Sequence, residues 1–192
     1  MMMKRFYYNL SKLQVVFEPS GISTMSSKSQ LDYNAKERGG ILLGRLFPDE
    51  NLIVVVDAIE SPAISSGHTE IYVNNDIANK KMKQQWKESG GKITYVGDWY
   101  THPETTPSPS FIDRDTFKST YHSSKIDQNF LLCVIIGTGP FEEGGGLWVG
   151  VHRYFKLYKL YYNLKNRLFF LQIIIILKMK KENKYIRTQD LY

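Results

Sequence analysis

The chain has 192 residues, 42% of them hydrophobic and 23% charged, so it is long enough to bury a core and is expected to form one domain plus an appendage. Its net charge of +6 is uneven: residues 153–192 hold ten Lys or Arg and two Asp or Glu, a net of +8, which leaves −2 for residues 1–152. The near-neutral body gives no support to a nucleic-acid-binding function. For the basic segment a solvated tail is the default expectation, with an acidic partner or a membrane surface as the alternative.

The single cysteine, Cys133, lies in the apolar run 130–136 and is expected to be a buried strand residue. One cysteine excludes an intramolecular disulfide, and the N-terminal segment lacks the roughly 7–15 apolar residues of a signal peptide. Both features favour a cytoplasmic protein.

The N-terminal half predicts a hairpin between two helices. Apolar runs bounded by Gly, Pro, Asn and Asp indicate the strands, and an apolar stripe at positions 78, 82 and 86 indicates the second helix. In chain order we expect a strand at 13–17, a helix at 23–36, strands at 41–47 and 52–56 around a turn at 48–51, a loop at 62–69, a short strand at 70–73 and a helix from 74 or 75 to 89.

The C-terminal half predicts strands around one further helix. Residues 92–96 read as a strand, prolines 103, 107 and 109 exclude regular structure, and a helix begins after Ser110. The continuous apolar run 130–136 is typical of a central strand, and a last strand is expected at 147–152, with an extension at 154–162. This order of elements indicates an α/β domain with helices on a mixed sheet.

Potential metal ligands gather at the end of the strand near residue 100. Tyr100 and His102 are two residues apart, so on a strand their side chains point the same way. Asp113 lies in the first turn of the next helix, and an imidazole, a phenol and a carboxylate could together hold a divalent metal such as zinc. The alternative is structural: Ser110 and Asp113 also fit a helix capping box, and a histidine before proline is common in loops.

Glu37 is the candidate general base. A metal that activates water needs a neighbouring group to accept the proton, and a carboxylate is the usual choice. Glu37 precedes the glycine pair that opens the predicted strand at 41–47. Taken alone, it would read as a surface glutamate at the end of a helix.

These segments together resemble the JAB/MPN family with its JAMM metal motif, and more narrowly the bacterial JAB-domain peptidases. The resemblance rests on Glu37-x-Gly-Gly-Ile-Leu-Leu-Gly, on Gly-Asp-Trp-Tyr-Thr-His-Pro, and on Ser110-Phe-Ile-Asp113 six residues later. It covers residues 15–153. It implies a mixed curved sheet flanked by helices, of the cytidine deaminase-like class, over residues 1–153, with 154–192 as an apolar and then basic extension.

The resemblance also implies a chemistry. His102 and Asp113 would bind zinc, Glu37 would take a proton from water, and Ser110 would help to stabilise the tetrahedral oxyanion. Family substrates are isopeptide or peptide bonds at the C-terminus of ubiquitin or ubiquitin-like proteins. Bacterial relatives belong to antiphage systems that remove or mature ubiquitin-like proteins.

Tyr100 stands where the family has its first metal-binding histidine. A phenol has a pKa of about 10, so it must lose a proton before it becomes a strong ligand. Three interpretations are open: Tyr100 substitutes as a ligand, it marks a pseudoenzyme, or it is a single-base change from His; His68 is a candidate replacement ligand. We therefore expect a metallopeptidase with weakened or lost catalysis. The alternative is a catalytically dead module that binds a ubiquitin-like protein or an operon partner.

The apolar run 168–177 is too short to cross a bilayer, which needs about twenty residues. It is expected to be an added strand, a docking helix or a dimer contact. Its composition also fits translated sequence beyond a truncated gene.

Overall fold

The computed structural model describes residues 6–10, 12–32, 34–66, 71–74, 76–124, 126, 128–141, 145–151 and 156–162. Its strands are β1 (Phe6–Leu10), β2 (Leu13–Phe17), β3 (Gly39–Phe47), β4 (Leu52–Glu60), β5 (Ala63–Ser66), β6 (Ile71–Val73), β7 (Thr94–Thr101), β8 (Phe130–Ile136), β9 (Gly145–Val151) and β10 (Lys156–Tyr162). Its helices are α1 (Pro19–Ser26), α2 (Asp76–Glu88) and α3 (Phe111–Ser123), with a 3₁₀ turn, η1 (Pro48–Glu50).

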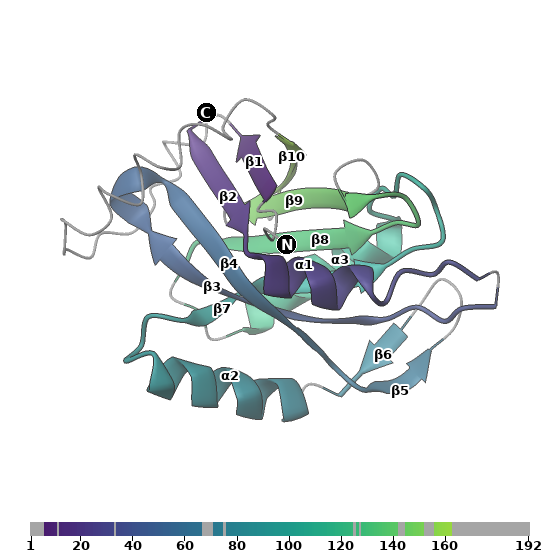
Figure 1. Ribbon diagram of the computed structural model, residues 1–192, viewed down its shortest axis with the longest axis horizontal. Helices are drawn as coiled ribbons and strands as arrows, with labels where there is room; N and C mark the ends of the chain where they lie inside the picture. Colours follow the sequence, from purple (N-terminus) through teal and green to yellow (C-terminus); the bar gives the residue numbers. More distant parts are fainter. Residues whose placement is uncertain are drawn as a thin grey trace.

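The main sheet is mixed and closes on itself. Its strand order is β1-β10-β9-β8-β7-β3-β4-β2, and β5 and β6 form a small separate sheet (Figure 1). Strands β2 and β4 run parallel, as do β7 and β8, and the other pairs are antiparallel. The expected α/β fold with a mixed curved sheet is confirmed.

Strand β8 shows why the sequence of this sheet is so apolar. Its even-numbered residues, such as Leu132 and Val134, belong to the central cluster inside the closed sheet. Its odd-numbered residues, such as Cys133, belong to a second cluster on the outer face. Both faces are therefore covered, which favours a continuous apolar run over alternation.

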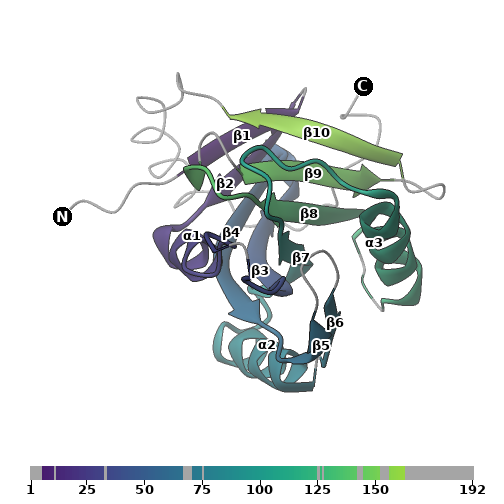
Figure 2. The same cartoon turned by 90° about the vertical axis from the view of Figure 1, so that its right-hand side faces the viewer.

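The three helices cover different parts of the sheet. Ile22 and Met25 of α1 join the central cluster, whereas Phe117 of α3 packs on the outer face of β8. Ala78 of α2 packs against residues of β3 and β4. Figure 2 shows α1 and α3 on opposite sides of the sheet, with α2 below them.

Two local predictions were wrong, and one strand was missed. Helix α1 begins at Pro19, not at residue 23, because proline suits the first turn of a helix; it ends at Ser26, where the Ser-rich segment turns. Residues 63–66 form β5, not a loop, because they pair with β6. Strand β1 was not anticipated at all.

The C-terminal part of the sheet extends past residue 153. Strand β10 pairs with β9 on one side and with β1 on the other. Of the extension expected at 154–192, the structure describes only residues 156–162, which form β10. Residues 163–192, with the apolar run 168–177, and His68 lie outside the described residues, so the division of the chain at residue 153 stays a prediction. Over the described ranges, no helix has the length and apolar character needed to cross a membrane.

Close backbone packing places the start of β3 against the end of β7. Gly39 pairs with Tyr100 and Gly40 with Trp99. A Cβ atom at Gly40 would overlap the carbonyl oxygen of Ile59 on β4, so only glycine fits there. The segment just before β3 is thereby held beside the segment just after β7.

Candidate metal centre

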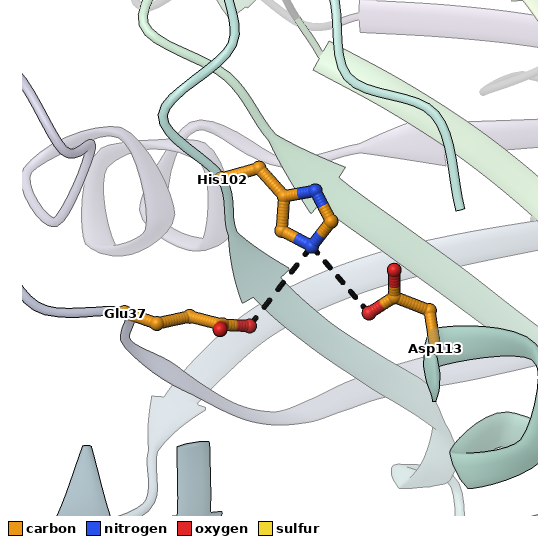
Figure 3. Close-up of side chains that lie close together, drawn as sticks. All are labelled: Glu37, His102 and Asp113. Carbon is orange, nitrogen blue, oxygen red and sulfur yellow. Dashed lines mark ion pairs between the residues drawn. The ribbon is translucent and has the colours of Figure 1, made fainter. Parts of the chain in front are cut away.

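Three segments bring one functional side chain each to the same point. Glu37 lies two residues before β3, His102 directly follows β7, and Asp113 is the third residue of α3. The backbone N–H of His102 donates to the carbonyl of Ile136 at 2.8 Å, which fixes the chain where it leaves the sheet. Figure 3 shows the three side chains pointing toward one another.

The distances suit a small cation. Nε2 of His102 lies 3.4 Å from Oδ1 of Asp113 and 4.0 Å from Oε1 of Glu37 (Figure 3). One donor atom from each residue lies within 4.8 Å of the others, and all three residues are buried. Two ligands of a tetrahedral zinc ion lie about 3.4 Å apart, so His102 and Asp113 already have this spacing. The donor set of one imidazole and two carboxylates fits a divalent ion.

The Ser110–Asp113 pair also performs the structural role expected of it. Ser110 Oγ accepts the backbone N–H of Asp113 at 3.1 Å, and Oδ2 of Asp113 accepts the backbone N–H of Ser110 at 2.6 Å. This is a complete capping box at the start of α3. It holds the Asp113 carboxylate so that its other oxygen, Oδ1, faces His102.

Electrostatics couple His102 to the acids around it. Burial alone would lower the pKa of His102, but Asp113, Glu37 and Glu104 outweigh it and raise that pKa above the ordinary value. Burial would raise the pKa of Asp113, but hydrogen bonds from His102 and Ser110 outweigh it and hold the pKa below its usual value. The site therefore favours a positive charge among its carboxylates, as a metal ion would supply.

A pair of hydrogen bonds joins the segment of Glu37 to that of His102. The backbone N–H of Arg38 donates to Thr101 Oγ1 at 2.9 Å, and the backbone N–H of Thr101 donates to the Arg38 carbonyl at 2.9 Å. The Arg38 side chain in turn pairs with Glu60 at 2.7 Å, and Lys28 pairs with the same carboxylate at 2.9 Å. Thr101 is fully buried, so its hydroxyl is committed to this contact.

Thr101→Val should destabilise the protein, because it leaves the Arg38 N–H without its acceptor while keeping the side-chain shape. An unsatisfied partly buried donor costs about 1–3 kcal/mol. Urea unfolding of wild type, Thr101→Val and Thr101→Ser measures this. Thr101→Ser keeps the hydroxyl and should lose less than the valine variant; equal stability of the serine and valine variants would contradict the role of this hydrogen bond.

Tyr100 occupies apolar surroundings. Its ring lies over Gly39 and packs against Phe117, with ring centroids 5.5 Å apart, and it borders the outer cluster that includes Cys133. Burial, together with the negative charges of neighbouring acids, raises the pKa of Tyr100 well above its ordinary value. The phenol therefore stays protonated near neutral pH and is a weak metal ligand.

The sequence did not single out three groups near the site. Thr101 bonds Arg38, Glu104 Oε2 lies 3.4 Å from His102 Nδ1, and Asp98 is buried on β7, two residues before Tyr100. Tyr95 donates to Asp98 at 2.9 Å, and burial raises the pKa of Asp98 to about 7. Strand alternation could have placed Asp98 on the face of Tyr100, but the roles of Thr101 and Glu104 depend on pairing partners that no local pattern shows.

Sequence comparison identifies a matching family. Residues 21–149 match the family described as prokaryotic homologs of the JAB domain. A protein of Escherichia coli named CD-NTase/cGAS isopeptidase is 31% identical over 105 residues, which cover 52% of this chain and 63% of that protein. The chain thus spans less than two thirds of that relative.

Two more relatives extend the comparison. A Pseudomonas aeruginosa protein with the same name is 28% identical over 63% of this chain and 75% of its own length. A protein of Sinorhizobium fredii named as a probable metalloprotease is 23% identical over 71% of this chain and 84% of its own length. The solution structure of a Desulfitobacterium hafniense protein, with 14% identity, covers 74% of this chain and 87% of its own with a TM-score of 0.52, a likeness of fold alone.

Proposed function

The chain belongs to the family of prokaryotic homologs of the JAB domain, and from that premise we propose that it is a zinc-dependent peptidase acting at the C-terminus of a ubiquitin-like protein. The observation that carries the proposal is the convergence of Glu37, His102 and Asp113 in one buried cluster. Relatives named as isopeptidase and as probable metalloprotease support both the bond type and the need for a metal. The isopeptidase relatives carry CD-NTase/cGAS in their printed names, so a CD-NTase joined to a ubiquitin-like protein is the first substrate to test.

Each residue has a proposed role in hydrolysis. His102 and Asp113 would hold the ion, which when bound supplies a Lewis acid and makes water easier to deprotonate. Glu37 accepts a proton as the water oxygen attacks the carbonyl carbon, and it returns a proton to the leaving amine as the C–N bond breaks. Ser110 Oγ accepts an N–H from Asp113, so its own hydrogen is available to the oxyanion.

Glu37→Gln tests the proposal, because it keeps the shape of the side chain and removes the base. We expect cleavage to fall by about 10²–10⁴-fold with little change in substrate binding. The measurement uses the full chain at a zinc concentration that saturates both wild type and Glu37→Gln, so that loss of cleavage reports loss of the base and not loss of the ion. The substrate is a ubiquitin-like protein fused through its C-terminal residue to a fluorescent protein. Cleavage is followed on gels, and binding by fluorescence anisotropy.

A non-catalytic binding module is the second candidate, favoured by the neutral, apolar-packed Tyr100. It predicts that wild type does not cleave the fusion and that Glu37→Gln binds it as tightly as wild type does. Cleavage by wild type that Glu37→Gln abolishes would exclude this candidate. Equal cleavage by both proteins would contradict the assignment of Glu37 as base.

Ser110 has two roles that substitution can separate. Glycine is tolerated as an N-cap at a cost of only about a few tenths of a kcal/mol, so Ser110→Gly should keep the fold. Loss of one oxyanion donor should nevertheless lower kcat by about 10²-fold. Ser110→Thr keeps the hydroxyl and should retain most of the turnover. A Ser110→Gly protein with unchanged kcat would leave Ser110 with its capping role alone.

A further inference from the structure

With Tyr100 standing where the related family has a histidine, His102 and Asp113 are the two strong ligands that the described residues offer the proposed ion besides Glu37. His102 and Asp113 supply one donor atom each, since the second oxygen of Asp113 is engaged by the backbone N–H of Ser110. The Tyr100 ring packs against Phe117 and over Gly39, in the apolar cluster beneath α3. Two protein donors are one fewer than the three that catalytic zinc sites provide.

Among the described residues, Glu37 is the nearest further donor on the Nε2 side of the His102 imidazole. Its Oε1 lies 4.0 Å from His102 Nε2, the same nitrogen that faces Asp113. Glu104 is excluded because it lies beside the opposite nitrogen, Nδ1, and is 59% exposed. Two ligands on one tetrahedral zinc ion are about 3.4 Å apart, so a shift of about 0.6 Å brings Glu37 into ligand spacing with His102. The donor atoms of Glu37 and Asp113 lie within 4.8 Å of each other.

The backbone keeps Glu37 in place for this contact. The backbone of the next residue, Arg38, makes two hydrogen bonds with Thr101: its N–H donates to Thr101 Oγ1, and its carbonyl accepts from the backbone N–H of Thr101. The Glu37 side chain is itself buried, at 3% exposure. A buried carboxylate on a fixed backbone loses little conformational entropy when it binds an ion, so the entropic cost of its binding is small.

We infer that, in the substrate-free chain, Glu37 is the third protein ligand of the ion, completing a set of one imidazole and two carboxylates. The inference rests on the proposed function and deepens it, because it states what occupies the place left by Tyr100. An ion bound to Oε1 withdraws charge from the Glu37 carboxylate and makes it a weaker base, so efficient turnover is expected when Glu37 leaves the ion. The oxygen-rich set should also weaken the preference for Zn²⁺ over Mn²⁺, since carboxylates suit Mn²⁺ and imidazole suits Zn²⁺.

A double-mutant cycle tests this inference without relying on activity. Wild type, Glu37→Gln, Tyr100→His and the double variant are prepared metal-free as full chains. Dissociation constants for Zn²⁺ and Mn²⁺ are measured by competition with a chromophoric chelator. Tyr100→Phe is the matched control, because it keeps the ring and removes only the hydroxyl. Thermal unfolding of each metal-free protein checks that all of them fold.

We expect the effect of Glu37→Gln on Zn²⁺ affinity to depend on which residue stands at position 100. In wild type, Glu37→Gln should weaken Zn²⁺ binding by at least about 10–100-fold, since even indirect partners of a metal contribute that much. In the Tyr100→His background the same change should have only a small effect, because the introduced histidine replaces Glu37 as ligand. Tyr100→His should also raise the Zn²⁺-to-Mn²⁺ preference, and Tyr100→Phe should change neither affinity.

Two results would overturn the inference. If Glu37→Gln changed the Zn²⁺ affinity equally with Tyr100 and with His at position 100, Glu37 would not be filling the ligand place that Tyr100 leaves. A large loss of affinity in Tyr100→Phe would make Tyr100 the third ligand. Failure of the proposed function is a separate outcome: the cycle would show the expected coupling, yet zinc-loaded Tyr100→His would not cleave the ubiquitin-like fusion.

Discussion

Tyr100→His should increase Zn²⁺ affinity by at least about 10–100-fold and should increase cleavage of a ubiquitin-like fusion. The reason is that an imidazole binds zinc in its neutral form, whereas burial keeps the Tyr100 phenol protonated. The added ligand also leaves Glu37 free to accept the proton of water. Zinc content by mass spectrometry and initial cleavage rates, compared with wild type and Tyr100→Phe, measure both effects.

The Tyr100→His substitution is also expected to lower the stability of the protein, and this effect must be measured separately from metal binding. Histidine fills less space than tyrosine against Phe117 and the outer cluster, so the metal-free variant should lose about 1–3 kcal/mol of stability. Bound zinc should restore stability in proportion to its affinity. Wild type that already holds stoichiometric zinc and cleaves as fast as Tyr100→His would contradict the idea that Tyr100 impairs the site.

Gly97→Ala should destabilise the fold by about 3 kcal/mol or more, because overpacking against a backbone atom cannot be relieved by a rotamer change. Gly97 lies on β7 beside Leu132 of β8, and an added Cβ would overlap the Leu132 carbonyl oxygen. The parallel β7–β8 pair would have to open, and β7 leads directly to His102. We therefore expect lower stability in urea and weaker metal binding together.

Gly21→Ala is the matched control for this glycine. Gly21 lies in helix α1, and the nearest atom to an added Cβ, on Asp57, is 3.4 Å away. Alanine is the better helix former by about 1 kcal/mol, so this variant should be as stable as wild type or more so. An unfolding midpoint of Gly97→Ala equal to that of wild type would show that β7 and β8 are not packed as closely as described.

The strands whose two faces are both buried could be predicted from sequence alone. Residues 130–136 and the hairpin around residues 48–51 carry long apolar runs with clear turn residues between them. Strand β1 could not be predicted this way, because residues 6–10 are a short segment of mixed polarity, although they pair with the neighbouring β2 as well as with the distant β10. Helix α1 begins earlier than predicted because Pro19, which cannot continue strand β2, also suits the first turn of a helix.

The candidate site, too, could be predicted from the sequence only in part. The strand end at Tyr100 and His102 and the helix start at Asp113 indicated a site, and the resemblance to the JAB/MPN family added Glu37 to it; the structure places Glu37, His102 and Asp113 together. The sequence did not reveal that Thr101 bonds Arg38 or that Tyr100 packs against Phe117. Those contacts join residues from different elements, and they depend on how the elements pack and not on any local pattern.

The central claim is that Glu37, His102 and Asp113 hold one divalent ion between them. Its most direct test is calorimetric titration of the metal-free full chain with Zn²⁺, in parallel with Asp113→Asn and His102→Gln. We predict one ion per wild-type chain and a loss of at least about 10–100-fold in affinity in each variant. Zinc binding of equal strength in all three proteins, or none in wild type, would contradict the claim.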